Sequence, residues 1–81
     1  MIIDEPMRPY VVTFVGEYFS MATTVELDMS EADMSSKSRE ELLEVAEDLA
    51  VNILNHHYGW DMRDVATVEI DVQEGMFPNG W

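Results

Sequence analysis

Two stretches near the start of the chain have the hydrophobic pattern of β-strands. Residues 10–15 are β-branched and aromatic with apolar side chains on both faces, which is typical of a strand covered on both sides. Residues 23–29 alternate between apolar and polar, which indicates a strand with one buried and one wet face. Because only a short turn separates the two, at 16–17 or at 19–20, we expect an antiparallel hairpin.

The hydrophobic period changes to 3.6 residues between positions 39 and 58, and this predicts a helix roughly 30 Å long. Ser38 and Glu41 have the spacing of a capping box at its start. Gly59 supplies a C-terminal stop, with Trp60 placed to fold back on the last turn. The apolar stripe that should face a sheet comprises Leu42, Leu43, Val45, Ala46, Leu49, Ala50, Ile53 and Leu54.

A third alternating stretch, residues 65–72, follows a tight connection at 61–64 and completes the order β-β-α-β. A polar connection at 30–37 separates the hairpin from the helix. Because the first strand is the most apolar, we expect it in the middle of a three-stranded sheet with spatial order 2-1-3. The helix crosses from the second strand to the third in a right-handed connection and packs on one face of the sheet. The predicted class is α+β, and nothing is predicted to cover the other face.

Charge changes this picture more than any other property of the composition. The 81 residues include 17 Asp and Glu against 4 Lys and Arg, which gives a formal net charge of −13 at pH 7. Hydrophobic residues make up 47%, too many for a disordered acidic tail. We therefore predict one small acidic domain over residues 1–81, with arms at 1–8 and 73–81.

The same charge favours a basic protein surface as the partner and disfavours direct contact with nucleic acid or anionic membranes. The chain has no cysteine, no apolar run near the ~20 residues that cross a bilayer, and no signal-peptide pattern at its start. These features predict a cytoplasmic location.

Eight carboxylates form the predicted partner-binding set. On the helix they recur three to four residues apart, which places neighbours about 6 Å from each other, whereas DNA phosphates repeat at roughly 7 Å along one strand. The wet sides of the second and third strands supply the rest. The competing interpretation is an ordinary solvated surface in a salt-adapted proteome, because most amphipathic helices have a charged outer face. The predicted set is Glu40, Glu44, Glu47, Asp48, Glu26, Asp28, Glu69 and Asp71.

Residue types that carry catalysis or bind metals are sparse. His56 and His57 point about 100° apart on a helix and lack further ligands at suitable spacing, so we predict no metal site. No nucleophile–base order and no phosphate-binding loop occurs, so we predict neither an enzyme nor a cofactor. Three aromatic side chains are the best candidates for contacts with a partner: Tyr18, Phe77 and Trp81.

Small size, extreme acidity, absence of cysteine and the β-β-α-β order resemble the small acidic accessory proteins of bacteriophages. That group includes DNA mimics and inhibitors of host defence, so the resemblance implies a stoichiometric, non-enzymatic inhibitor in the host cytoplasm. No motif is shared, and no functional positions carry over. Two alternatives stay open: an assembly subunit that forms a homodimer through the open sheet face, and an immunity-type partner of a basic toxin.

Overall fold

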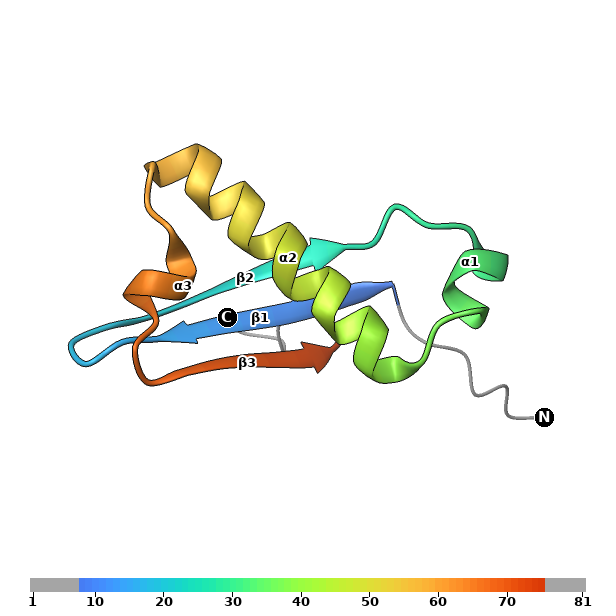
Figure 1. Ribbon diagram of the computed structural model, residues 1–81, viewed down its shortest axis with the longest axis horizontal. Coiled ribbons are helices and arrows are strands. Elements are labelled where there is room, and N and C mark those ends of the chain that lie inside the picture. The colour runs from blue at the N-terminus through green and yellow to red at the C-terminus, as the bar shows by residue number, and fades with distance from the viewer. Residues whose placement is uncertain (1–7, 76–81) are drawn as a thin grey trace.

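A three-stranded antiparallel sheet organises the molecule (Figure 1). The computed structural model describes residues 8–75. The strands are β1 (Pro9–Val15), β2 (Ser20–Glu26) and β3 (Glu69–Glu74), in the order β2-β1-β3. β1 is antiparallel to both neighbours, so β2 and β3 run parallel to each other. The predicted α+β class, the central position of the first strand and the order 2-1-3 are confirmed.

The hairpin turn is tighter than the sequence pattern indicated. The Gly16 N–H donates to the Phe19 carbonyl at 2.9 Å, so pairing resumes at once and β2 begins at Ser20 rather than at residue 23. A side chain at position 16 has no room, because a Cβ there would lie 2.6 Å from the Phe19 ring and 3.0 Å from the Val65 carbonyl oxygen. A side chain at position 16 would therefore displace the Phe19 ring and crowd the Val65 carbonyl oxygen.

The long helix α2 (Arg39–Tyr58) has the predicted start and stop. The Ser38 hydroxyl accepts from the Glu41 N–H at 3.2 Å, and the Glu41 carboxylate accepts from the Ser38 N–H at 3.3 Å. Gly59 ends the helix in the left-handed conformation, with φ of 76°. Trp60 folds back as expected, and its ring stacks on that of Tyr58 with the centroids 5.5 Å apart.

Two short helices replace segments that were predicted to be irregular. α1 (Glu31–Ser35) begins after the N-cap Ser30, and α3 (Met62–Val65) begins after the N-cap Asp61. Because α3 takes up Val65, β3 begins at Glu69, later than the predicted residue 65. Single capping side chains account for both helices, which are too short to show a hydrophobic period.

All three helices contribute to one core on one side of the sheet. In Figure 1, α2 crosses the sheet diagonally and its last turns extend beyond β2. Ile53 is therefore 46% exposed, contrary to the predicted stripe, and Val51 is buried in its place. The buried core comprises Tyr10, Val12, Phe14, Val25, Leu27, Met34, Leu42, Ala46, Ala50, Val51, Leu54 and Met62.

The opposite sheet face carries the alternate side chains of β1, which include Val11, Thr13 and Val15. Within residues 8–75, no helix lies over this face. The predicted arm at 73–81 starts too early, because β3 continues to Glu74. Phe77 and Trp81 lie outside the described residues.

Replacing Ser38 with alanine removes the hydroxyl that accepts from the Glu41 N–H, but it keeps the backbone N–H that donates to the Glu41 carboxylate. We expect Ser38→Ala to lower the free energy of unfolding by about 1 kcal/mol, measured by urea denaturation. Ser35→Ala is the matched control, because Ser35 is exposed and its side chain makes no hydrogen bond with any described residue. Equal stability of the two variants would contradict the assignment of the cap.

Candidate functional site

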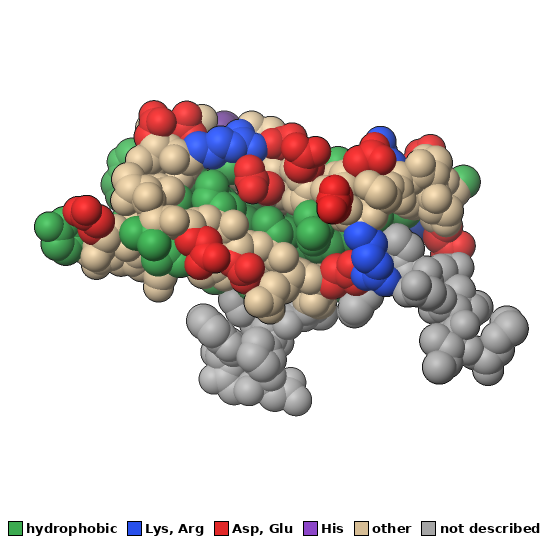
Figure 2. Space-filling model, turned by 60° about the horizontal axis from the view of Figure 1, so that its bottom comes forward, with side chains coloured by type: hydrophobic (Ala, Val, Ile, Leu, Met, Phe, Trp, Pro, Cys, Tyr) green, Lys and Arg blue, Asp and Glu red, His purple; other side chains and the backbone are tan. Residues whose placement is uncertain are grey.

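A groove lies between α2 and β3, with a volume of about 270 Å³. Its floor is apolar and is formed by Leu43, Ile70 and Val72, all of them half-buried. Its rim on α2 is formed by Glu40, Glu44 and Glu47. Figure 2 shows this strip of hydrophobic side chains between acidic side chains on either side. The combination of an apolar floor and an acidic rim makes this groove the candidate site.

Local sequence periods place these residues together. On α2, positions 40, 43, 44 and 47 are three or four apart, so their side chains share one helix face. On β3, Ile70 and Val72 are two apart and both point toward the helix, as do their β1 partners Phe14 and Val12. The helix face and the strand face therefore meet along one line.

Arg63 of α3 pairs with two of the predicted docking carboxylates. Its Nη2 lies 3.1 Å and its Nε 3.3 Å from Glu47 Oε2, and Nη2 also donates to Asp48 Oδ1. The hydrogen bonds to Asp48 and then Glu47 raise the pKa of the Arg63 guanidinium above its usual value. Two of the four predicted carboxylates on the helix, Glu47 and Asp48, thus already form ion pairs within the protein.

A second arginine–carboxylate pair joins the start of α2 to the end of β3. The Arg39 guanidinium donates to Glu74, whose side chain lies on the helix-facing side of the sheet. Between this pair and the Arg63 pair, Glu40 and Glu44 make no ion pair with any described residue. The uncompensated negative charge of the groove is therefore concentrated at these two glutamates.

The remaining predicted carboxylates do not join the groove. Glu69 and Asp71 alternate with the floor residues of β3 and so lie on the opposite sheet face. Glu26 ends β2 and Asp28 follows it, on the other side of β1 from β3. The structure brings together Glu40, Glu44, Glu47 and Asp48, and separates them from the other four.

Sequence reasoning missed the floor of the groove and the free edge of β3. The signal was available in part, because the predicted order 2-1-3 already made the third strand an edge. When a helix packs on a sheet, the helix-facing side chains of an edge strand lie next to the side of the helix. Leu43, Ile70 and Val72 could have been found in this way.

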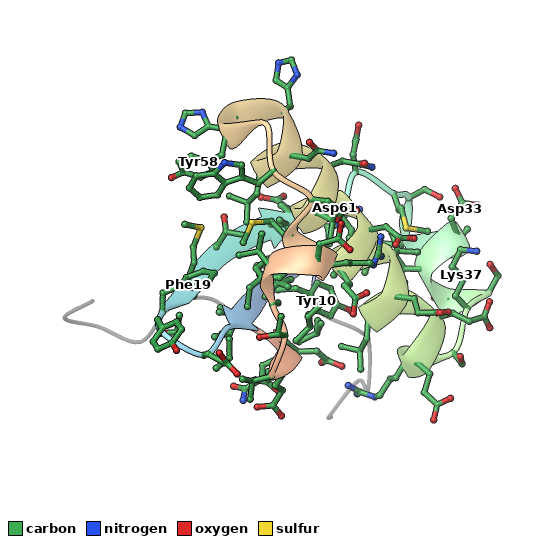
Figure 3. All side chains as sticks on the ribbon, turned by 60° about the vertical axis from the view of Figure 1, so that its left-hand side comes forward. Tyr10, Phe19, Asp33, Lys37, Tyr58 and Asp61 are labelled. Carbon is green, nitrogen blue, oxygen red and sulfur yellow. The ribbon has the colours of Figure 1, made fainter. Side chains whose placement is uncertain are left out.

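A second hollow, of about 420 Å³, lies at the hairpin end of the molecule. Phe19, Met21, Trp60 and Val65 line it, and Tyr58 stacks on Trp60. Figure 3 shows Phe19 and Tyr58 at this same end. Trp60 is 52% exposed, and aromatic side chains of this kind are enriched in protein interfaces. The hollow has no titratable lining residue, so it offers contact area without acid–base chemistry.

No arrangement typical of metal binding appears within residues 8–75, because no three His, Asp or Glu side chains gather at suitable distances. His56 and His57 are exposed in the last turn of α2. The rings of His57 and Tyr58 meet edge to face, with their centroids 4.6 Å apart. None of the helices in the described part of the chain is long and apolar enough to cross a membrane. The absence of catalysis stays a prediction.

Tyr10 lies in the core, between the sheet and the helices (Figure 3). Its hydroxyl is buried and has no hydrogen-bond partner among the described residues. Burial raises the pKa of Tyr10, the negative charge of Glu74 adds to the increase, and Arg39 opposes it. The hydroxyl is therefore held in its neutral form inside the protein.

This shift predicts a loss of stability in alkali. The folded state holds the Tyr10 proton more tightly than the unfolded state, so stability falls as the pH rises above the ordinary tyrosine pKa of 10.0. We expect Tyr10→Phe to stay within about 1 kcal/mol of the wild type at neutral pH and to fall less steeply in alkali. Thermal unfolding from pH 8 to 11 measures this, with exposed Tyr18→Phe as a control that keeps the wild-type slope.

Comparison with known proteins gives this chain no relative. No family model, no curated protein and no solved structure matches it. The likeness to phage accessory proteins thus rests on composition and element order alone, and it stays a prediction. The function is therefore inferred from the chemistry of the groove.

Proposed function

We propose that this chain is a non-enzymatic protein-binding module whose groove between α2 and β3 takes a basic, partly apolar segment of another protein. The observation that carries the proposal is a pair of glutamates that make no ion pair with any residue of 8–75, Glu40 and Glu44, beside the apolar floor of Leu43, Ile70 and Val72. A partner that covers the floor and brings cations to the rim satisfies both parts of the site.

The electrostatic part has a local and a long-range component. Glu40 and Glu44 are like charges at i and i+4, which weakens a helix by about 0.2–0.5 kcal/mol, and a bound cation relieves this repulsion. The net charge of −13 attracts a basic partner from a distance and speeds its encounter. The apolar floor then adds roughly 25 cal/mol for each Å² that the partner covers.

Mimicry of DNA is a narrower version of this function. It requires the nucleic-acid groove of another protein as the partner, and competition by duplex DNA is its test. The ion pairs of Arg63 with Glu47 and Asp48 reduce the negative charge available for such mimicry. In addition, the phosphate backbone of DNA has no feature that corresponds to the apolar floor of the groove. An immunity-type complex with a basic toxin would use the same surface without competition from DNA.

A homodimer is the second candidate. The sheet face opposite the helices carries Val11, Thr13, Val15 and Ala22, and no described helix covers it. Sedimentation velocity at micromolar concentration decides this candidate: a dimer is expected if the face joins two copies, and a monomer contradicts it.

Charge reversal tests the groove. We expect Glu40→Lys/Glu44→Lys to weaken binding of peptides selected on the wild type from a random 12-residue library by at least about tenfold, or about 1.4 kcal/mol. The selected peptides should combine Lys or Arg with apolar residues. Fluorescence anisotropy gives the dissociation constants, and thermal unfolding verifies that each variant is folded.

Glu26→Lys/Asp28→Lys is the matched control. It changes the net charge by the same +4, from −13 to −9, and leaves the groove intact. Its binding should stay within about threefold of the wild type, since only long-range attraction is reduced. Equal loss in both double variants would show that total charge, and not the groove, governs binding.

A further inference from the structure

We propose that the partner segment binds in extended form as a fourth strand on the edge of β3 that faces away from β1. Its apolar side chains lie on the floor of the groove, its alternate basic side chains point to the opposite sheet face, and a basic residue at one end turns toward Glu40 and Glu44. This inference rests on the proposed function and specifies the shape and the residue pattern of the ligand.

The free edge offers backbone groups for pairing. Within the described residues, β3 pairs with β1 alone. The Gly75 N–H donates to the Pro9 carbonyl at 2.9 Å, and residues of an antiparallel pair bond to their neighbour alternately. By this register Asp71 and Gln73 bond to β1, whereas Ile70 and Val72 direct their N–H and C=O groups outward. These outward groups lie directly beside the groove.

An added strand would meet both separated sets of carboxylates. Its alternate side chains point to opposite faces of the sheet. Those toward α2 cover Ile70, Val72 and Leu43 beneath the glutamate rim. Those on the other face lie beside Glu69 and Asp71. A ligand confined to the groove would reach only the first set, because β3 itself lies between the two.

Charge selects the occupant of this edge. A second copy of the chain pairing through β3 would bring Glu69, Asp71 and Glu74 of both copies into one short ladder, and like charges opposite each other destabilise a strand pair. A helix in the groove would leave the outward groups of Ile70 and Val72 unpaired. The pattern therefore fits an extended segment of about seven residues that alternates Arg or Lys with Val, Ile or Leu.

Two synthetic peptides of identical composition test the pattern. One alternates arginine and valine over seven residues, beginning and ending with arginine, and the other has four arginines followed by three valines. Against the full chain, we expect the alternating peptide to bind at least about tenfold more tightly at moderate salt. Placing N-methyl groups one position at a time along the alternating peptide should weaken binding at every second residue, because only alternate amides face β3.

Amide hydrogen exchange gives an independent readout on the protein. In the complex with the alternating peptide, exchange at Ile70 and Val72 should slow at least about tenfold, whereas Asp71 and Gln73, already bonded to β1, should change little. The modifications are in the peptide, so they cannot unfold the protein.

The outcomes separate the two proposals. Equal affinity for both peptides, or binding without slowed exchange at Ile70 and Val72, overturns strand addition and leaves the acidic groove in place. If neither peptide binds and the Glu40→Lys/Glu44→Lys variant binds library peptides like the wild type, the proposed function fails as well.

Discussion

The structure depends on β1 more than on any other element. This strand uses both of its edges, one for β2 and one for β3, and it buries Tyr10, Val12 and Phe14 completely against the helices. Without it the hairpin and the third strand have no common partner, and α2 has no surface on which to pack. The central place of β1 also leaves β2 and β3 as edges. The free edge beside the groove is thus a direct consequence of the arrangement that holds the fold together.

Two arginines make the ion pairs between elements that the structure describes. Arg39 ties the start of α2 to the end of β3, and Arg63 ties α3 to the middle of α2. These exposed pairs each contribute about 0–1 kcal/mol at most, so they do not hold the core together. They decide where negative charge is compensated. Within the groove, the carboxylates without an ion pair to any described residue are Glu40 and Glu44.

The sequence predicted elements well where local chemistry decides them. Ser38, Glu41 and Gly59 set the ends of α2 through their own backbone contacts, and the apolar character of residues 10–15 placed β1 in the centre. Predictions were wrong where tertiary contacts decide. Ile53 is exposed because α2 extends beyond the sheet. β3 begins late because the helix that Asp61 caps takes up Val65, the first residue of the alternating stretch.

In the candidate site too, the sequence predicts what local periodicity decides and misses what tertiary contacts decide. The alternation of β3 already implied that Glu69 and Asp71 lie opposite Ile70 and Val72, but the engagement of Glu47 by Arg63 depends on how α3 folds back. That pairing joins residues 16 positions apart, beyond the reach of helix or strand periodicity.

The four-residue helix α3 contributes a lining residue to one hollow and an ion-pair partner to the rim of the other. Arg63 holds Glu47 at the rim of the acidic groove, while Val65 lines the aromatic hollow at the hairpin end. Any ligand cation that takes Glu47 competes with Arg63 for it. The Arg63 pair is one of the contacts that position α3, together with the cap at Asp61 and the buried side chain of Met62. One short helix thus connects the two surfaces, so a substitution that unfolds α3 alters both of them.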